Sequence, residues 1–429
     1  VVDRSIALLG EPGAILDGAA ATHILRVEAN DVVIRGLTFR NVRLSHVEDR
    51  AAIRVGKVTG CRIEGNQLVN AFFGIYLAGT EDCDVARNTL AGRPARSEES
   101  SGNGIHLWAA RRIRITNNRI TGHRDGIYLE FAHNTVVTDN VSERNLRYGL
   151  HFMTSDDCAY TRNTFRGNQA GVAVMYARRV EMTHNEFVDN WGASSYGLLL
   201  KEIYDSRVDS NTFARNTTAL FADGATRMQA RGNAFADNGW AVKLMASTES
   251  AELSGNAFTG NTFDVATNST RSSSTFERNY WDAYRGYDLD RDGFGDVPFR
   301  PVRLFSLIVE LNPAARALLR SRQHDRLGRA LAAEPVPVRR DSPTRLGRVQ
   351  RGAFQRLRLL EQPHLAGATV LAHLRPAAGG AVGHPPLRGA EQLELPAGPR
   401  PGGVRRVLPE HQGQHLGHPD EPGRRRPER

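Results

Sequence analysis

The sequence of 429 residues has little sulfur and no long apolar segment. It contains three cysteines and five methionines, and it lacks the run of about 18 apolar residues that a membrane-spanning helix requires. The sequence shows no secretion signal, and because the first residue is not Met we expect the natural chain to begin further upstream. The sequence therefore predicts no transmembrane helix and leaves the cellular compartment open.

The three cysteines do not form a recognisable redox or zinc motif, since none of them belongs to a CxxC pair. Cys61, Cys83 and Cys158 each lie five residues before an asparagine, so they share one position of a repeat. We interpret them as small buried thiols. A Cys61–Cys83 disulfide stays open as an alternative, because the spacing alone does not establish it.

The net charge of +9 is absent from most of the chain. Residues 322–429 hold 19 arginines against 10 acidic residues, whereas residues 1–321 hold 37 basic and 37 acidic residues. Residues 322–429 also lack Lys, Asn, Ile, Met, Tyr, Trp and Cys, and they hold 14 of the 19 prolines. This low-complexity tail is either disordered or an out-of-frame translation of a GC-rich gene, which we favour. A nucleic-acid partner is therefore not predicted.

A repeat of about 22 residues fills the rest of the chain. Gly104, Gly126, Gly149 and Gly171 are spaced 22, 23 and 22 residues apart, and apolar residues alternate after each one. An asparagine also recurs, mostly every 22 or 23 residues, at positions 66, 88, 118, 140, 163, 185, 211, 233, 256 and 279. A second asparagine follows five residues later in most repeats, at positions 145, 168, 190, 216, 238 and 261.

These periods predict an all-β fold, a right-handed parallel β-helix of about ten coils over residues 1–278. Apolar residues alternate with period 2, which indicates strands, and 22 residues accommodate three short strands and three turns. We expect asparagine at each turn to adopt the left-handed bend and to hydrogen-bond along the stack, with phenylalanine two residues later stacked inside. A leucine-rich solenoid is the alternative, but its leucine spacing is missing. Residues 279–321 are predicted to form an acidic loop and a docking segment.

The strand after each glycine predicts one stripe of outward-facing side chains. In this phase the first and third residues after the glycine are aliphatic and face the core, while the second and fourth face out. We call the candidate site residues of this face the stripe. They are His106, Trp108, Tyr128, Glu130, His151, Met153 and Met175. His151, Met153 and Met175 are expected to be mutual neighbours, with His106 two coils away.

Outward methionine and tryptophan are unusual on a solvated strand, where polar residues are the rule. Imidazole and thioether groups together suit copper(I). Three interpretations stay open for the stripe: ordinary packing beneath insertion loops, a protein-docking patch, or a direct copper site. Four other histidines lie at positions of the repeat that we expect to form loops: His46, His123, His133 and His184. We expect them to be solvated.

An acidic stretch near the end of the repeat region is a separate candidate metal site. Asp288, Asp290, Asp292 and Asp296 alternate around Gly293, which places oxygen ligands around one point as calcium requires. The loop is not an EF-hand, because Phe299 stands where its bidentate glutamate would be. A structural calcium site and a solvated acidic turn are both open.

The chain resembles the NosD family, the periplasmic maturation proteins of nitrous oxide reductase. The stretches that carry the resemblance are GNGIHLW (102–108), RDGIYLEF (124–131), RYGLHFMTSDD (147–157), VAVMYA (172–177), YGLLLKE (196–202) and NYWDAYRGYDLDRDGFGD (279–296). The resemblance implies a periplasmic, non-enzymatic accessory protein. Its partners would be an ABC-type ATPase and permease complex, a copper chaperone lipoprotein and nitrous oxide reductase, whose copper–sulfur centre they help to assemble. Copper would bind transiently, and the membrane would be met only through the permease.

A polysaccharide lyase or hydrolase on the same fold is the alternative function, because fold alone does not decide function. Such an enzyme needs clustered carboxylates, or a basic residue beside calcium, in a groove. Glu130 and Asp223 share a predicted column but lie four coils apart, too far for a paired-carboxylate site.

Overall fold

The computed structural model describes residues 1–19, 23–45, 47–93, 97–269, 273–303, 306 and 344–345. All of these residues belong to one compact unit, Val1–Pro363. Apart from Thr344 and Arg345, the predicted low-complexity tail lies outside the described residues. So do His46 and, apart from Ser306, residues 304–321 at the end of the predicted docking segment. Within the described residues, no helix is long and apolar enough to cross a membrane.

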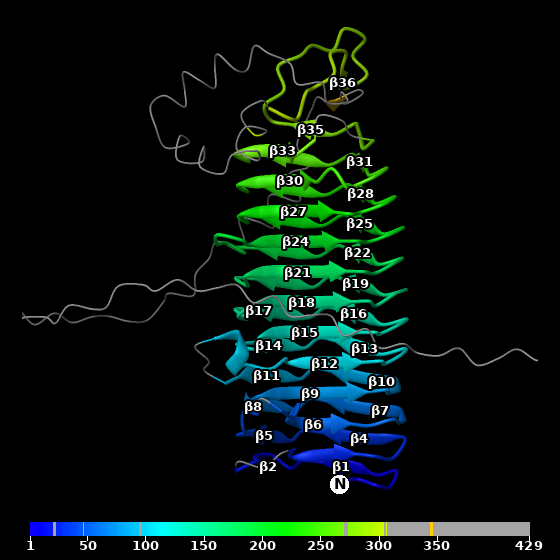
Figure 1. Cartoon of the computed structure of the whole chain (residues 1–429), viewed down its shortest axis with the longest axis vertical. Coiled ribbons are helices and arrows are strands. Elements are labelled where there is room, and N and C mark those ends of the chain that lie inside the picture. Colours follow the sequence, from blue (N-terminus) through cyan, green and yellow to red (C-terminus); the bar gives the residue numbers. More distant parts are fainter. Residues whose placement is uncertain are drawn as a thin grey trace, which may run out of the picture. The chain divides into compact units, whose positions relative to one another are not determined.

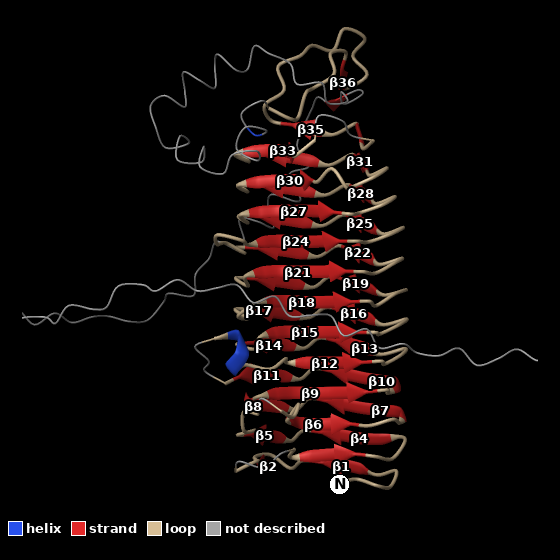
Figure 2. Cartoon of the chain, in the orientation of Figure 1, coloured by secondary structure: helices blue, strands red, loops and turns tan. Residues whose placement is uncertain are grey.

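Three parallel sheets run the length of the repeat region (Figures 1 and 2). Each coil contributes one strand to each sheet, except the last described coil, which contributes only to the first two. The first sheet consists of β1 (Ala7–Leu9), β4 (Val32–Arg35), β7 (Thr59–Glu64), β10 (Glu81–Ala86), β13 (Arg114–Thr116), β16 (Val136–Thr138), β19 (Ala159–Thr161), β22 (Glu181–Thr183), β25 (Arg207–Asp209), β28 (Gln229–Arg231), β31 (Glu252–Ser254) and β34 (Thr275–Glu277). The second consists of β2 (Ile15–Asp17), β5 (Thr38–Arg40), β8 (Gln67–Ala71), β11 (Thr89–Gly92), β14 (Arg119–Thr121), β17 (Val141–Glu143), β20 (Thr164–Arg166), β23 (Glu186–Val188), β26 (Thr212–Ala214), β29 (Ala234–Ala236), β32 (Ala257–Thr259) and β35 (Tyr280–Trp281). The third consists of β3 (Leu25–Val27), β6 (Ala51–Val55), β9 (Phe73–Ala78), β12 (Ile105–Trp108), β15 (Asp125–Glu130), β18 (Tyr148–Met153), β21 (Ala170–Met175), β24 (Tyr196–Lys201), β27 (Thr218–Asp223), β30 (Trp240–Leu244) and β33 (Phe263–Thr267).

The predicted right-handed parallel β-helix is confirmed, although it has about twelve coils where ten were expected. The first two sheets have 12 strands each among the described residues. Counting from the recurrent asparagines begins at Asn66 and so misses the coils before it. In the coil of β4 and β5, Leu37 takes the place of the asparagine, and its N–H still donates to Asn66 Oδ1 at 3.0 Å.

The recurrent asparagines form the predicted hydrogen-bonded ladder. Asn163 is representative: its Nδ2 donates to Asn185 Oδ1 (3.0 Å) and to the carbonyl of Val137 (2.9 Å), and its Oδ1 accepts from Asn140 Nδ2 (3.0 Å). The expected left-handed asparagine is wrong, however. The left-handed residue comes directly before it, as at Arg162 (φ 54°). The bend turns the chain, and the asparagine that follows extends its side chain into the turn to bond the next coil.

The core is a set of stacked rows of apolar side chains. The predicted phenylalanine row is confirmed: Phe187, Phe213, Phe235 and Phe258 stack with ring centroids 4.5, 4.8 and 4.9 Å apart. The glycine column of the third sheet has a packing reason. A Cβ on Gly149 would lie 2.6 Å from the carbonyl oxygen of Gly171, so no larger residue fits without a backbone shift.

Two of the three cysteines are bonded, so the interpretation of all three as free thiols is wrong. Cys61 on β7 and Cys83 on β10 are paired in register and form a disulfide. Adjacent coils place their Cα atoms 4.5 Å apart, within the range a disulfide spans. Cys158 is free and buried, and burial raises the pKa of its thiol to about 12.

Insertions in the repeat occur at one corner of the coil. The first lies between β11 and β12 and includes the 3-10 helix η1 (Glu98–Ser100), and the second lies between β23 and β24. Both join a strand of the second sheet to a strand of the third sheet. Beyond β35, the strand β36 (Phe294–Gly295) pairs antiparallel with β37 (Thr344–Arg345).

Candidate functional site

The predicted stripe is present on the third sheet in the expected register. His106 on β12 pairs with Tyr128 on β15, which pairs with His151 on β18. In the second row, Glu130 pairs with Met153, and Met153 pairs with Met175 on β21. Parallel β-pairing therefore brings together residues that are 22 to 69 positions apart in the chain.

The two histidines of the stripe are buried, although the stripe was expected to be a surface feature. His106 is 6% exposed and His151 is 2% exposed. Aromatic rings enclose both imidazoles: the ring centroid of Tyr128 lies 4.8 Å from that of His106 and 4.6 Å from that of His151. Tyr76 lies 4.4 Å from His106, and Tyr148 lies 4.8 Å from His151. The stripe thus contains a closed stack of alternating tyrosine and histidine rings.

A third row of the same face was missed by sequence reasoning. It consists of the residues directly before each glycine, and it includes Asn103, Asp125 and Tyr148. The period-2 alternation does not predict this row, because counting back from His151 places Gly149, not Tyr148, on the outward face. A Cβ on Gly149 would instead lie 2.9 Å from the core ring of Phe165. Asn103 and Asp125 are both buried, with 0% of their surface exposed, and they contact the imidazoles.

Asp125 and His151 form a buried carboxylate–imidazole pair. Asp125 Oδ2 lies 3.4 Å from His151 Nδ1, and Asp125 Oδ1 accepts a 3.3 Å hydrogen bond from the N–H of Tyr148. Burial lowers the pKa of His151, and the hydrogen bond and charge of Asp125 oppose this only in part. The imidazole is therefore neutral near pH 7, and a neutral imidazole has a lone pair to offer a metal ion.

His106 makes related contacts two coils earlier in the same row. Its Nδ1 lies 3.4 Å from Asn103 Nδ2, and its Nε2 lies 3.7 Å from Glu130 Oε2. The interaction with His106 is the largest cause that lowers the pKa of Glu130, which therefore carries a negative charge near pH 7. Each imidazole thus has its Nδ1 beside the row before the glycine.

The outer row of the stripe is accessible. Trp108 is 43% exposed, while Glu130, Met153 and Met175 are half-buried. A neutral imidazole two residues from one thioether, with a second thioether on the next strand, is a donor set that suits copper(I). The donor chemistry and the register of His151, Met153 and Met175 therefore fit copper(I), whereas His106 is two coils from His151.

The remaining residues of the columns do not form a carboxylate pair. Glu130 and Asp223 are separated by four strand pairings, from β15 through β18, β21 and β24 to β27. At about 4.8 Å per strand this is about 19 Å. Paired-carboxylate glycosidases hold their carboxyl groups less than about 10 Å apart, so these two residues cannot act together in that way.

The prediction that His123 is solvated is wrong. Its side chain is fully buried, and burial lowers its pKa to about 4 against the opposing effect of the backbone of Gly102 and Phe72. His123 takes the place of the second asparagine in its coil, where the side chain points into the turn, and its N–H donates to Asn145 Oδ1 at 3.1 Å. His133 is half-buried, and His184 is exposed, as predicted.

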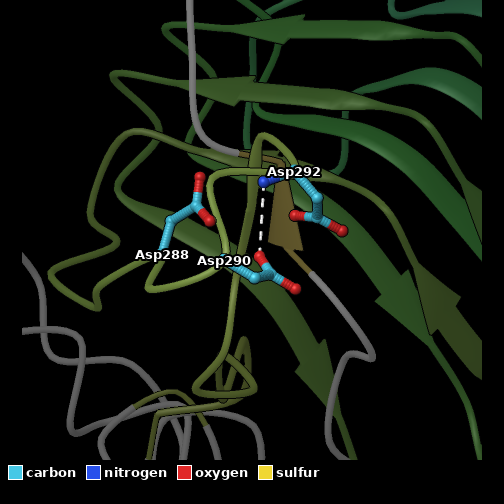
Figure 3. A group of neighbouring side chains, drawn as sticks. All are labelled: Asp288, Asp290 and Asp292. Carbon is cyan, nitrogen blue, oxygen red and sulfur yellow. Dashed lines mark hydrogen bonds between the residues drawn. The ribbon is translucent and has the colours of Figure 1, made fainter.

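The acidic loop brings together three of its four predicted ligands (Figure 3). Carboxylate oxygens of Asp288, Asp290 and Asp292 lie within 4.8 Å of one another. Asp296 is outside this group, and its Oδ2 accepts a 2.7 Å hydrogen bond from the N–H of Leu289. The pKa of Asp290 is raised: the N–H of Asp292 lowers it, but desolvation and the neighbouring carboxyl groups outweigh that effect. Calcium binding stays a prediction.

Comparison with known proteins gives consistent matches over the repeat region. A family model described as periplasmic copper-binding protein (NosD) matches residues 92–287. A Pseudomonas aeruginosa protein named "Probable ABC transporter binding protein NosD" is 32% identical over 363 residues, covering 80% of this chain and 84% of the relative. A Stutzerimonas stutzeri protein of the same name is 28% identical over 339 residues, covering 75% and 77%.

Solved structures that resemble this chain share its fold at low sequence identity. The DFA-IIIase from Arthrobacter chlorophenolicus A6, without its lid, matches with a TM-score of 0.50 at 15% identity, covering 61% of this chain and 81% of the other. A family 28 exopolygalacturonase from Yersinia enterocolitica matches with a TM-score of 0.46 at 10% identity, covering 57% and 59%. At such identities the likeness concerns the fold alone.

Proposed function

Because this chain belongs to the NosD family of periplasmic copper-binding proteins, we propose that it is a non-enzymatic scaffold and copper relay for the copper–sulfur centre of nitrous oxide reductase. The proposed site of action is the periplasm. Copper(I) is the cargo, held transiently and handed on. The proposal rests on the family, whose curated members are named as binding proteins, together with the donor set of the stripe.

The observation that carries the proposal is the register of three soft donors. Met153 pairs with Met175 across neighbouring strands, and His151 lies two residues before Met153 on the same face. We assign these three residues to copper(I), with Glu130 as a neighbouring charge. Thioether and neutral imidazole ligands bring no charge, so they bind copper(I) without the strength of thiolate ligands. A weaker site suits a relay, because the ion must leave again.

The exposed edge of the stripe suits partner docking. Trp108 stands in the same row as Met153 and Met175 and presents a large apolar surface beside them. Tryptophan and methionine are enriched in protein interfaces. We propose that the copper chaperone lipoprotein and nitrous oxide reductase dock here in turn, and that an ABC-type ATPase and permease complex binds elsewhere on the chain. The name of the curated relatives supports the transporter as a partner.

A copper(I) titration of the full chain tests the proposed site. Ala substitution of His151, Met153 and Met175 together should abolish stoichiometric binding, whereas Met182→Leu, a volume-conserving change of a core methionine, should leave binding unchanged. Circular dichroism checks that each variant keeps its fold. If the triple variant is folded and copper loading of the reductase is unaffected, the stripe is not the site.

The alternative is a polysaccharide lyase or hydrolase on the same scaffold. The separation of Glu130 and Asp223 weighs against a paired-carboxylate mechanism between those residues. Turnover of oligosaccharides by the purified chain, with unsaturated or reducing-end products, would support the enzyme and overturn the accessory role.

A further inference from the structure

We propose that Asp125 is a positioning residue: it holds the hydrogen of His151 on Nδ1 and leaves the lone pair on Nε2 for copper(I). This inference rests on the proposed function for its ligand. It concerns the row before the glycine, which lies beside the stripe on the same face and contributes no ligand itself.

The geometry around the carboxylate determines the tautomer. Asp125 Oδ2 lies 3.4 Å from His151 Nδ1. A carboxylate oxygen accepts hydrogen bonds, so the imidazole nitrogen that faces it, Nδ1, carries the hydrogen. The second oxygen, Oδ1, faces the N–H of Tyr148 at 3.3 Å, which fixes the carboxylate from the other side. The lone pair of His151 is therefore on Nε2.

The Nε2 atom of His151 is buried and has no hydrogen-bond partner within the described part of the chain. A buried acceptor without a partner is destabilising. Nε2 is separated from Nδ1 by one ring carbon, so its lone pair leaves the ring in a different direction from the N–H that faces Asp125. A ligand atom requires this arrangement: a free lone pair on a ring that is held in place through its other nitrogen.

The fold itself does not require a carboxylate at this position. Other coils have Asn103, Tyr148 and Ala170 directly before the glycine, all compatible with the same strand register. Burying a carboxylate is expensive, and the ion pair that Asp125 forms with Arg124 is long, at 3.8 Å, so it offsets this cost only weakly. A buried carboxylate at Asp125 is therefore less favourable for folding than the neutral residues that other coils have at this position. This supports a role of Asp125 in orienting His151.

The tautomer can be read directly in the full chain by NMR of imidazole-labelled ¹⁵N-histidine. Comparison with His151→Gln assigns the signal. We expect long-range couplings that identify the Nδ1–H form in the wild type and a mixture of tautomers in Asp125→Asn, whose amide donates as well as accepts. Asp264→Asn, which changes another buried carboxyl on the third sheet, is the matched control and should leave His151 unchanged. An Nε2–H form in the wild type would overturn the positioning role.

Copper(I) affinity provides the second readout. Loss of an outer carboxylate partner typically weakens metal binding 10- to 100-fold, and we expect a loss in this range for Asp125→Asn and none for Asp264→Asn. Unchanged affinity in folded Asp125→Asn would overturn the link to copper. If the wild type binds no copper(I), the proposed function fails. The tautomer of His151 in the wild type then tests the role of Asp125 separately: the Nδ1–H form supports it, and the Nε2–H form contradicts it.

Discussion

Met153 and Met175 occupy the same position on the neighbouring parallel strands β18 and β21, with their Cα atoms paired in register. Parallel strands lie about 4.8 Å apart, so both side chains leave the sheet side by side on the same face. Neither side chain is fully buried. Two thioethers in this arrangement can approach one ion from neighbouring coils.

Substitution of either methionine should impair the same site. We expect Met153→Ala and Met175→Ala each to weaken copper(I) binding about tenfold or more, and the double variant to lose less than the product of the two effects, because one substitution already breaks the shared site. Competition with a chromophoric copper(I) chelator measures the affinities. Met245→Ala, further along the same row, is the control. Fully independent, multiplying losses would contradict a shared ion.

The asparagine ladder should be important for stability at each rung. In Asn163→Ala, the Val137 carbonyl and the backbone N–H of Asn140 each lose a hydrogen-bond partner. Unsatisfied buried groups cost about 1–3 kcal/mol each, so we expect the free energy of unfolding, measured with urea, to fall by an amount of this order. The exposed amide Gln169→Ala should change stability by less than about 0.5 kcal/mol. Equal effects of the two substitutions would show that the ladder is dispensable.

His123 should make the fold sensitive to acid. Its pKa is lowered to about 4 in the folded chain, so between that value and its ordinary pKa of 6.5 the unfolded chain binds a proton that the folded chain does not. Stability is therefore lost as the pH falls from about 6.5 towards 4. The loss by pH 5 is about 2 kcal/mol.

His123→Asn should remove this part of the pH dependence, because asparagine occupies the equivalent place in later coils such as that of Asn145. Thermal unfolding at pH 7 and pH 5 measures the difference between the two proteins. The pKa of Asp264, raised to about 6 by burial, changes stability in the opposite direction in both proteins and cancels in the comparison. An equal loss in both proteins would contradict the assignment to His123.

The acidic loop offers a separate test. If Asp288, Asp290 and Asp292 hold calcium, Asp290→Ala should abolish the binding heat in calorimetry. Calcium needs several oxygen ligands, and the substitution removes one of the three carboxylates that supply them. Asp237→Ala, on a corner of the β-helix, should leave that heat unchanged. Absence of any heat in the wild type would favour the solvated acidic turn.

The sequence predicted the fold because the repeat appears directly as spacing. The alternation after Gly126 and Gly149 indicated which side chains face the core, and the parallel register then placed Met153 beside Met175. Burial of the imidazoles could not be predicted in this way. It depends on residues such as Asn103 and Tyr148, whose contacts arise only when neighbouring coils are stacked.

His123 and Cys61 show the same limit. The period places His123 at a turn, but whether a turn side chain points inward depends on the left-handed residue before it, here Gly122 (φ 70°). The period also places Cys61 beside Cys83, yet bond formation depends on side-chain geometry that spacing does not reveal.

The shared corner of the two insertions has a consequence for how such chains diversify. An extra residue within a strand would shift every following side chain to the opposite face and break the rows. Extra residues between the second and third sheets do not, as the segments before β12 and β24 show, since both strands remain paired in register. Loops of different length can therefore be accommodated at this corner, beside the stripe, without changing the spacing of its donor atoms.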